Sequence, residues 1–422
     1  MKIRAIVFPF FAAFFLISCI EDDKVYRPIP PQADLQFEIQ ELVTKEFDTY
    51  KDSVPAYPGG IAFKVIYGNK SCFASAGLGT DVGENIHFRA ASNTKTFTAT
   101  AILLLYQQGK LDVNAKITDT IPGTSETYVP NTPAYNLPYK SSIRILDLLR
   151  HRAGVYDVTN EVIPDTVSAP FPYKGMNYVE YIYQTDKLHN FTFDELIGVV
   201  SGAHLSYFSP GTGYHYSNTG YSILGKIIER VSGKTYQNFL MENVIRPMGL
   251  RQSSMPVSGT DIIIPSPFAS GFVMTADTLY NVTQSNVSGN VAEGNLITTP
   301  ADLAKFLQKL LTGKGVLSPR FVNSIMMNYV PTNDVAAGGY GCGLSYTSGL
   351  GYGHTGAHEG FLSYMIYDPE MDLTMVAFTN VWNLKGGSST MYYQLTDLLE
   401  SLMYKTKALI KFGDGLNQNP NH

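Results

Sequence analysis

Apolar residues recur along the chain at two spacings, and these spacings predict the order of its helices and strands. Near the start, a helix is expected over 36–52 because apolar residues have helical spacing at Leu35, Ile39, Leu42, Val43 and Phe47. Strand-like runs follow at 60–67 and 72–77, and Gly68-Asn69-Lys70-Ser71 between them is typical of a hairpin turn. A long helix is expected over 92–108, which Gly109 ends.

The middle of the chain, about 110–290, is punctuated by Pro and Gly and carries shorter helical patterns at 143–151, 192–200, 221–231 and 236–244. A further helix is predicted over 299–311, strands over 361–367 and 373–379, and a closing helix over 390–409. This order of elements predicts an α+β body with a mainly helical insert at about 110–290.

The first residues are typical of a leader rather than of a folded element. A basic start, Met1-Lys2-Ile3-Arg4, precedes an apolar run over 5–17, which is shorter than the roughly 20 residues that span a bilayer. Leu16-Ile17-Ser18-Cys19 resembles the signal of bacterial lipoproteins, in which the leader is cut before the cysteine and the thiol is acylated. The resemblance implies a signal peptide over 1–18, a lipid anchor on Cys19 and a tether over 19–35. An ordinary secretory leader is the alternative.

The anchor predicts where the protein is found. Glu21-Asp22-Asp23 resembles the surface-export signal of some Gram-negative lipoproteins, although a merely solvated tether explains these residues as well. We therefore expect an exported lipoprotein in the outer membrane or periplasm, or on the surface, of a Gram-negative-type bacterium. We expect Cys72 and Cys342 to be buried free thiols, because the sequence cannot place them within bridging distance.

Composition narrows the class further. The 422 residues carry 31 Lys+Arg and 36 Asp+Glu, a net charge of −5, and this mild acidity argues against a nucleic-acid partner. Charged residues make up 16%, against about 25% in typical globular chains. Three cysteines are too few for a disulfide-stapled domain.

The first candidate motif is Ser92-Asn93-Thr94-Lys95. Residues three apart share a helix face, so the Lys95 amine can reach the Ser92 hydroxyl, which needs an adjacent base to become a nucleophile. The positive end of the helix opposes protonation of Lys95 and favours negative charge on Ser92. The motif alone is equally compatible with a helix N-cap at Ser92 and a surface lysine.

The second motif is Tyr216-Ser217-Asn218, which follows the turn Pro210-Gly211-Thr212-Gly213. A tyrosine beside a lysine and a serine can shuttle a proton, and Asn218 could bind a substrate carbonyl or hold Lys95. The chain has a second match, Tyr236-Gln237-Asn238, inside a predicted helix, where a core aromatic is the favoured interpretation.

The third motif is His354-Thr355-Gly356 within a glycine-rich stretch, which predicts an extended edge that a ligand backbone can approach. His354 and His358 are four residues apart, as in some helical metal pairs. The neighbouring glycines disfavour a helix there, and no further ligand cluster is evident, so no metal is expected.

Together, S-x-x-K, Y-S-N and H-T-G in this order resemble the penicillin-binding protein and class C β-lactamase superfamily of serine hydrolases. The stretches 145–154 and 293–303 add to the resemblance, which covers roughly 40–405. It implies a β-lactamase-like domain over 36–410 and a tail over 411–422. It also implies an antiparallel sheet of five or more strands flanked by the N- and C-terminal helices.

The same resemblance implies a role for each motif residue. Ser92 would be acylated, Lys95 and Tyr216 would manage the proton, and the backbone N–H groups of Ser92 and Ala357 would form the oxyanion hole. Which of Lys95 and Tyr216 is the general base stays open. The residues expected to bind substrate are Asn218, His354, Thr355 and Gly356. No cofactor is required.

Two departures from the family pattern bear on the substrate. His354 stands where many members have Lys, and a histidine with a pKa near 6.5 need not be charged. Ala357 lacks a hydroxyl that could bind a substrate carboxylate. The expected function is hydrolysis of D-amino-acid peptides or related amides, as in DD-carboxypeptidases and class C β-lactamases. An esterase on small acyl esters and a non-catalytic penicillin-binding sensor are the alternatives.

Overall fold

A computed structural model describes residues 32–54, 56–332 and 338–412. The predicted signal peptide, Cys19 and most of the expected tether lie outside these ranges, as do residues 413–422 of the expected tail. Helix α1 (Gln32–Ser53) begins before the predicted start at residue 36, and α12 (Ser401–Phe412) continues past the predicted end of the domain at residue 410.

A seven-stranded sheet forms the centre of the described body, with the order β2-β1-β11-β10-β9-β8-β7. Every neighbouring pair is antiparallel. The strands are β1 (Ile61–Tyr67), β2 (Lys70–Ala76), β7 (Gly339–Tyr340), β8 (Ser345–Thr347), β9 (Gly351–His358), β10 (Phe361–Asp368) and β11 (Leu373–Thr379). The expected antiparallel sheet of five or more strands is therefore confirmed.

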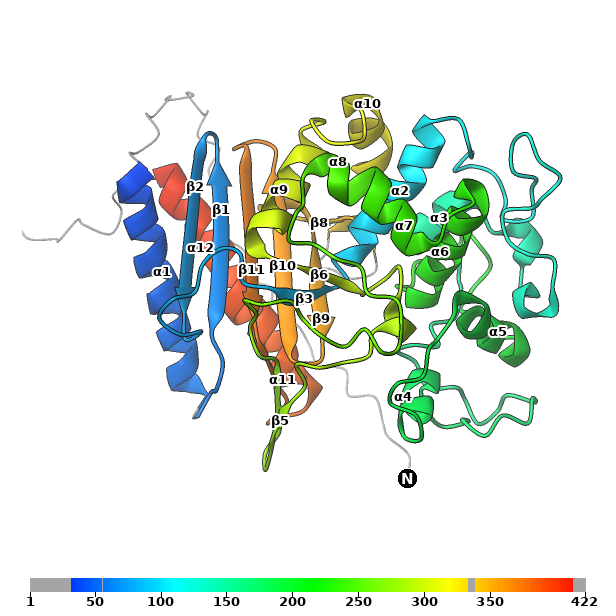
Figure 1. Ribbon diagram of the computed structural model, residues 1–422, viewed down its shortest axis with the longest axis horizontal. Coiled ribbons are helices and arrows are strands. Elements are labelled where there is room, and N and C mark those ends of the chain that lie inside the picture. The colour runs from blue at the N-terminus through cyan, green and yellow to red at the C-terminus, as the bar shows by residue number, and fades with distance from the viewer. Residues whose placement is uncertain (1–31, 55, 333–337, 413–422) are drawn as a thin grey trace, which may run out of the picture. The chain divides into compact units, whose positions relative to one another are not determined.

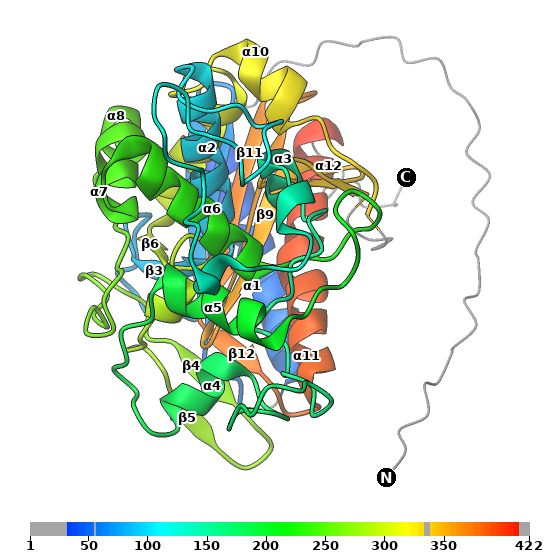
Figure 2. The same ribbon diagram turned by 90° about the vertical axis from the view of Figure 1, so that its right-hand side faces the viewer.

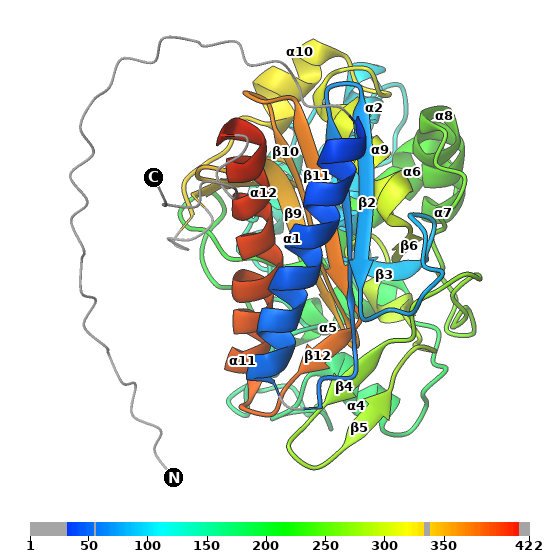
Figure 3. The same ribbon diagram turned by 90° about the vertical axis from the view of Figure 1, so that its left-hand side faces the viewer.

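One face of the sheet is covered by the terminal helices. Alternate residues of β1, such as Ile61 and Phe63, belong to a core with α1 and α12, as the period of two in a strand requires. Figure 3 shows α1 and α12 side by side in front of the sheet. The helical stretch that leads into α12 is α11 (Ser388–Tyr393) followed by a π-helical segment, Gln394–Glu400.

The opposite face is covered by α2 (Thr94–Gln107), α9 (Pro300–Leu311) and the insert (Figures 1 and 2). The insert contains α3 (Ile145–Leu149), α4 (Tyr178–Tyr183), α5 (Phe193–Ala203), α6 (Asn218–Ser232), α7 (Tyr236–Leu240) and α8 (Arg246–Met248). A π-helical segment, Met241–Ile245, joins α7 to α8, and α10 (Pro319–Phe321) runs into another, Val322–Met326. Short 3₁₀ turns occupy Pro133–Tyr135, Lys140–Ser142 and Ser288–Asn290.

The insert is less purely helical than the sequence predicts. Its last part contains β4 (Phe272–Met274) and β5 (Leu279–Asn281), which form a small sheet with β12 (Val381–Asn383) from the body. These strands have three residues each, too few for a period of two to be recognised in the sequence. Helix α4, only six residues long, also escaped prediction.

A two-stranded sheet carries the chain toward the first motif. Strand β3 (Phe88–Ala91) pairs with β6 (Leu296–Thr298), and the register shifts between Arg89 and Ala91. Ala91 has a left-handed backbone with a φ of 49°, which is uncommon for a residue other than glycine. This bend redirects the chain from β3 into α2 immediately before Ser92.

Two further expectations concern the cysteines and the membrane. Cys72 and Cys342 are both buried thiols that form no disulfide, as predicted. Over the described ranges, no helix has the length and apolar character that a bilayer crossing demands.

Candidate active site

The three motifs meet at one cavity of about 1310 Å³ between the body and the insert. Ser92, Tyr216, Asn218 and His354 line it, and so do Thr355 and Ala357 from β9. Lys95 is fully buried beneath Ser92. The sequence-predicted residues are therefore brought together from β9 and from the starts of α2 and α6, although they are far apart along the chain.

Ser92 and Lys95 sit at the start of α2. The Lys95 backbone N–H donates to the Ser92 carbonyl (3.0 Å), and Lys95 Nζ lies 3.1 Å from Ser92 Oγ. The helix begins at Thr94 with Asn93 as its N-cap, so Ser92 is not the capping residue. Because residues 94–105 of α2 are all buried, the lysine side chain has no route to solvent and is not a surface residue.

Lys95 is held by the insert and by the loop before β6. Its Nζ donates to Asn218 Oδ1 (2.7 Å) and to the Glu293 carbonyl (3.0 Å), and it forms an ion pair with Glu293 Oε2 (3.2 Å). Burial lowers the pKa of Lys95, and the negative charge of Glu293 opposes this shift. The sequence analysis gave Glu293 no role, since nothing local marks a residue 198 positions away as a partner of Lys95.

Asn218 is itself held in place. As the first residue of α6, it donates its backbone N–H to Asp157 Oδ2 (3.1 Å) and its side-chain amide to Thr159 Oγ1 (3.0 Å). Thr159 Oγ1 in turn donates to Asp157 Oδ1 (2.8 Å). The Asn218 oxygen is therefore directed at Lys95, which favours the second of the two roles expected for this residue.

Tyr216 reaches Ser92 from the insert. Its hydroxyl is hydrogen bonded to the Ser92 side chain, and its ring centroid lies 4.7 Å from Lys95 Nζ. Burial raises the pKa of Tyr216 well above its usual value, although the hydrogen bond with Ser92 acts in the opposite direction. Tyr216 is consequently an uncharged phenol at neutral pH.

His151 positions the segment that carries Tyr216, a role the sequence analysis missed. Its Nδ1 accepts the Ser217 backbone N–H (3.1 Å), and its ring centroid lies 4.2 Å from that of Tyr216. Its own carbonyl accepts the His215 N–H (3.0 Å). Burial keeps the pKa of His151 well below its usual value, so the imidazole is neutral and can accept this bond.

His354 is also a neutral imidazole with both nitrogens occupied. Its Nδ1 lies 2.6 Å from the Thr355 carbonyl, which can only accept, so Nδ1 carries the proton. Its Nε2 then accepts from the Tyr340 hydroxyl (2.9 Å). Burial, with the positive charge of Lys95 nearby, lowers the pKa of His354 to about 3. This histidine therefore places no positive charge in the cavity wall.

Among the described strands, β10 alone pairs with the part of β9 beside the cavity, so the other side of β9 is a free edge there. Strand β8 pairs with β9 only over 351–353, whereas β10 pairs with it as far as His358. The hairpin of β9 and β10 closes at His358–Phe361, so the neighbouring Ala357 is in a non-hydrogen-bonded pair. Its N–H is directed away from β10, toward the free edge.

One face of Gly356 packs against the turn that carries Ser92, a contact that the sequence did not reveal. A Cβ at this position would overlap the Ala90 carbonyl oxygen and lie 2.5 Å from Ser363 Oγ. Asn93 Nδ2 donates to both of these oxygens (2.8 Å each). The glycine therefore allows the turn that carries Ser92 to lie against β9.

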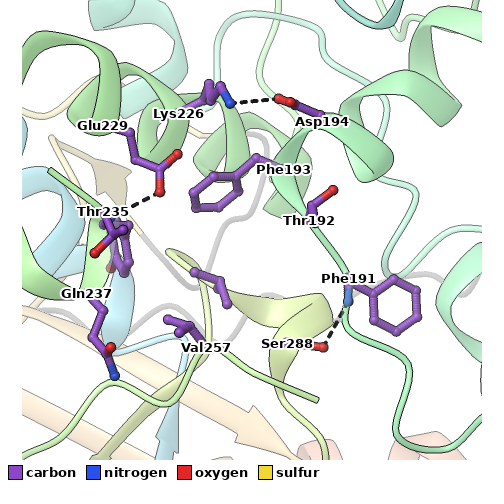
Figure 4. A pocket seen from close by; sticks show the side chains of 12 residues that line it. Phe191, Thr192, Phe193, Asp194, Lys226, Glu229, Thr235, Gln237, Val257 and Ser288 are labelled. Atoms are coloured by element: carbon purple, nitrogen blue, oxygen red, sulfur yellow. Dashed lines mark hydrogen bonds and ion pairs between the residues drawn. The ribbon is translucent and has the colours of Figure 1, made fainter. Parts of the chain in front are cut away.

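A second cavity, of about 350 Å³, lies within the insert and shares no lining residue with the first (Figure 4). Tyr236, from the second Y-x-N match, lines it and hydrogen bonds to Thr98 (2.8 Å) as a buried core residue. The interpretation of Tyr236 as a core aromatic is confirmed. In the described parts of the chain, His, Cys, Asp and Glu residues form no group of three or more that could bind a metal.

The comparisons with known proteins agree with this arrangement. The family model described as Beta-lactamase matches residues 54–398, so the chain belongs to the β-lactamase family of hydrolases. It is 27% identical over 206 residues to penicillin-binding protein 4* of Bacillus subtilis (strain 168), covering 48% of this chain and 38% of that protein. It therefore spans well under half the length of this relative.

Other similarities cover more of the chain. A protein of Escherichia coli (strain K12), provisionally named a D-alanyl-D-alanine carboxypeptidase, is 23% identical over 321 residues, which cover 69% of this chain and 68% of that protein. A D-stereospecific amidohydrolase from Streptomyces sp. has a TM-score of 0.66 at 24% identity, covering 86% of this chain and 98% of that one. The D-amino acid amidase from Ochrobactrum anthropi SV3, solved with D-phenylalanine, has a TM-score of 0.66 at 24% identity, covering 87% and 99%. The fold is that of β-lactamases and transpeptidases.

Proposed function

We propose that this chain is a serine hydrolase that forms an acyl-enzyme on Ser92 and cleaves amide bonds of D-amino acids. The observation that carries the proposal is the distance of 3.1 Å between Lys95 Nζ and Ser92 Oγ in a site closed to solvent beneath the serine. A nucleophile and a base within hydrogen-bond reach, with the base held by a third group, are the arrangement that activates a serine. Asn218 is that third group.

The directions of the pKa shifts favour Lys95 over Tyr216 as the base. The pKa of Lys95 is lowered, so its amine form is more accessible, whereas the raised pKa of Tyr216 makes a phenolate less accessible. In the proposed mechanism Lys95 accepts the proton of Ser92 as Oγ attacks the substrate carbonyl. The proton taken up by Lys95 is then relayed through the Tyr216 hydroxyl to the leaving amine, so both residues regain their starting forms, and water hydrolyses the ester on Ser92.

We assign two backbone N–H groups, those of Ser92 and Ala357, to stabilise the oxyanion that forms on the substrate carbonyl when Ser92 attacks it. The free edge of β9 turns the Ala357 N–H toward the cavity side, and Ala357 and Ser92 line the same cavity. Donors of this kind contribute about 2.7–4 kcal/mol to transition-state stabilisation.

The charges around the cavity favour a substrate without a carboxylate beside the scissile bond. His354 is uncharged, and Ala357 has no hydroxyl to add a hydrogen bond. Lys187, on the exposed loop after α4, is the one lysine or arginine among the residues that line the cavity in the described chain. Glu180 and Glu359 line it too, and burial together with the charge of Glu180 raises the pKa of Glu359. An amino-acid amide with a free ammonium group suits these charges better than a C-terminal peptide or a β-lactam.

A labelling experiment tests the nucleophile. A fluorophosphonate probe followed by mass mapping should modify Ser92, and Ser92→Ala should remove the label. Modification of another residue, or equal labelling of the variant, would refute the assignment.

A substrate panel tests the class of reaction. D-phenylalaninamide should be turned over faster than L-phenylalaninamide, a D-Ala-D-Ala peptide or nitrocefin. Turnover of a p-nitrophenyl ester alone would make the protein an esterase, and a preference for the D-Ala-D-Ala peptide would make it a carboxypeptidase. Either outcome would contradict the proposed amide substrate.

We also propose that Cys19 anchors the exported protein to a membrane. The support is the sequence Leu16-Ile17-Ser18-Cys19. In a Gram-negative host, the wild-type protein should sediment with membranes and Cys19→Ser should be released. Retention of the variant on membranes would refute the anchor.

A further inference from the structure

Glu293 holds Lys95 with its main chain and its side chain at once. Its carbonyl oxygen is 3.0 Å and its carboxylate Oε2 is 3.2 Å from Lys95 Nζ, and both partners are buried. The second carboxylate oxygen accepts a hydrogen bond from Asn290 Nδ2 (2.6 Å), which fixes the orientation of the group. The carboxylate is thus a built part of the site.

The hydrogen-bonding capacity of Lys95 limits what it can do in this arrangement. Four oxygens lie within 3.2 Å of Nζ, and one of them is Ser92 Oγ. The other three are Asn218 Oδ1, the Glu293 carbonyl oxygen and Glu293 Oε2. The first two can only accept hydrogen bonds, and so can Oε2 while the carboxylate is ionised. An ammonium group has three N–H donors, so these acceptors use all of them. The Ser92 hydroxyl can donate to Nζ only when Lys95 has lost a proton and presents a lone pair.

We infer that Glu293 is a positioning residue that holds Lys95 in its protonated resting form and thereby sets the pH above which Ser92 can be acylated. The inference rests on the proposed function of Ser92 and Lys95. Lys95 first releases one proton through Glu293, which lines the cavity, and its amine then receives the proton of Ser92 as Oγ attacks the acyl donor.

The other charged and titratable groups around Lys95 and Glu293 do not stabilise the Lys95 ammonium in the way that Glu293 does. They are His151, Asp157, Tyr183, Tyr216, Tyr221, Tyr236 and His354. The two histidines have lowered pKa values and the four tyrosines raised ones, so all six are uncharged near neutral pH. The carboxylate of Asp157 accepts bonds from Asn218 and Thr159, whereas that of Glu293 forms an ion pair with Lys95 itself.

The test is the rate at which the fluorophosphonate acylates Ser92 in the full chain, measured from pH 4 to pH 9. In Glu293→Gln the loss of the negative charge should move the acidic limb to lower pH by about 1–3 units, because an opposite charge at this distance shifts a pKa by that amount. Glu293→Asp keeps the negative charge but moves it away from Lys95 by one methylene. The acidic limb of this variant should therefore lie between those of wild type and Glu293→Gln. Glu126→Gln is the matched control, because this exposed residue pairs with Arg230 instead.

The outcomes separate the inference from the function on which it rests. If the acidic limb of Glu293→Gln lies at the same pH as that of wild type, the inference is overturned and Glu293 has a purely structural role. This holds whether or not the maximal acylation rate falls. Circular dichroism checks the fold; if Glu293→Gln does not fold, an unshifted limb in Glu293→Asp overturns the inference instead. A wild-type chain in which Ser92 is not labelled at any pH refutes the proposed function and the inference with it.

Discussion

Lys95 donates a hydrogen bond of 2.7 Å to Asn218, a residue 123 positions further along the chain. Both residues lie in the first turn of a helix, Lys95 in α2 and Asn218 in α6. The bond therefore joins the buried helix of the body to the insert, and it fixes the amine beside Ser92. Lys95 and Thr159 hold the two ends of the Asn218 side-chain amide, and Asp157 accepts a hydrogen bond from its backbone N–H, so the residue has little freedom.

Replacing Asn218 tests this connection. In Asn218→Ala the Lys95 amine loses an acceptor, and a hydrogen bond to a charged group contributes about 1.5–3 kcal/mol. The rate of Ser92 acylation should fall by roughly 10- to 150-fold, with a smaller change in substrate binding. Asn238→Ala in the second Y-x-N match is the control, because Asn238 is exposed and should tolerate the change. Equal rates for the two variants would contradict the role of Asn218.

A hydroxyl at position 357 should change the preference for carboxylates. Ala357 is exposed at the free edge of β9, so Ala357→Thr adds a hydroxyl without crowding the core. One hydrogen bond of about 0.5–1.5 kcal/mol should raise kcat/KM for a D-Ala-D-Ala peptide relative to D-phenylalaninamide by roughly 2- to 10-fold. Ala357→Val has the same shape without the hydroxyl, so an equal change in that variant would contradict the explanation.

We predict that stability and acylation require glycine at position 356, because there is no space for a side chain there. In Gly356→Ala the new Cβ would overlap Ala90 and push the Ser92 turn away from β9, since the backbone there cannot shift cheaply. We expect a loss of stability of about 1–3 kcal/mol and a fall in acylation rate. Gly83→Ala has open space around its Cβ and should change neither quantity. Unfolding in urea and labelling with the fluorophosphonate measure both.

Because of His354, the folded chain should become less stable as the pH falls. Its pKa is about 3 in the folded chain, below the usual value near 6.5, so the unfolded chain binds more protons between these values. Stability from this residue is therefore complete above pH 6.5 and is lost as pH falls toward 3, with a slope of at most about 1.4 kcal/mol per pH unit.

Urea unfolding of wild type and His354→Asn between pH 7 and pH 4 checks this slope. The stability of wild type should fall more steeply than that of the variant, which lacks the titrating group. Parallel curves would contradict a buried, neutral His354.

The sequence identified the parts of the site that lie in short motifs. Ser92 and Lys95 are three residues apart, and Tyr216 and Asn218 adjoin a glycine turn, so local spacing was enough to find them. The long helices and the strands β10 and β11 were predicted for a similar reason, because their apolar periods extend over seven residues or more.

What the sequence could not indicate depends on contacts between distant segments. Glu293 and His151 stand in stretches that add to the family resemblance, but their roles depend on contacts with Lys95 and Tyr216 that no local pattern indicates. The charge of His354 could not be read from its identity either, since its burial and its bond to Tyr340 decide it. The contact between Gly356 and the Ser92 turn could not be predicted either, because it joins segments that are far apart in the sequence.

The cavity divides the molecule into parts that can vary independently. Its wall is built largely from the long loops of the insert, where Val162 and Leu188 are 49% and 50% exposed, whereas the residues proposed to react lie at the starts of α2 and α6. Exposed loop positions usually tolerate substitution within about 0.5 kcal/mol. A mutant library confined to these loops would therefore explore new substrates while the residues proposed to transfer protons stay fixed, which makes this scaffold a starting point for directed evolution.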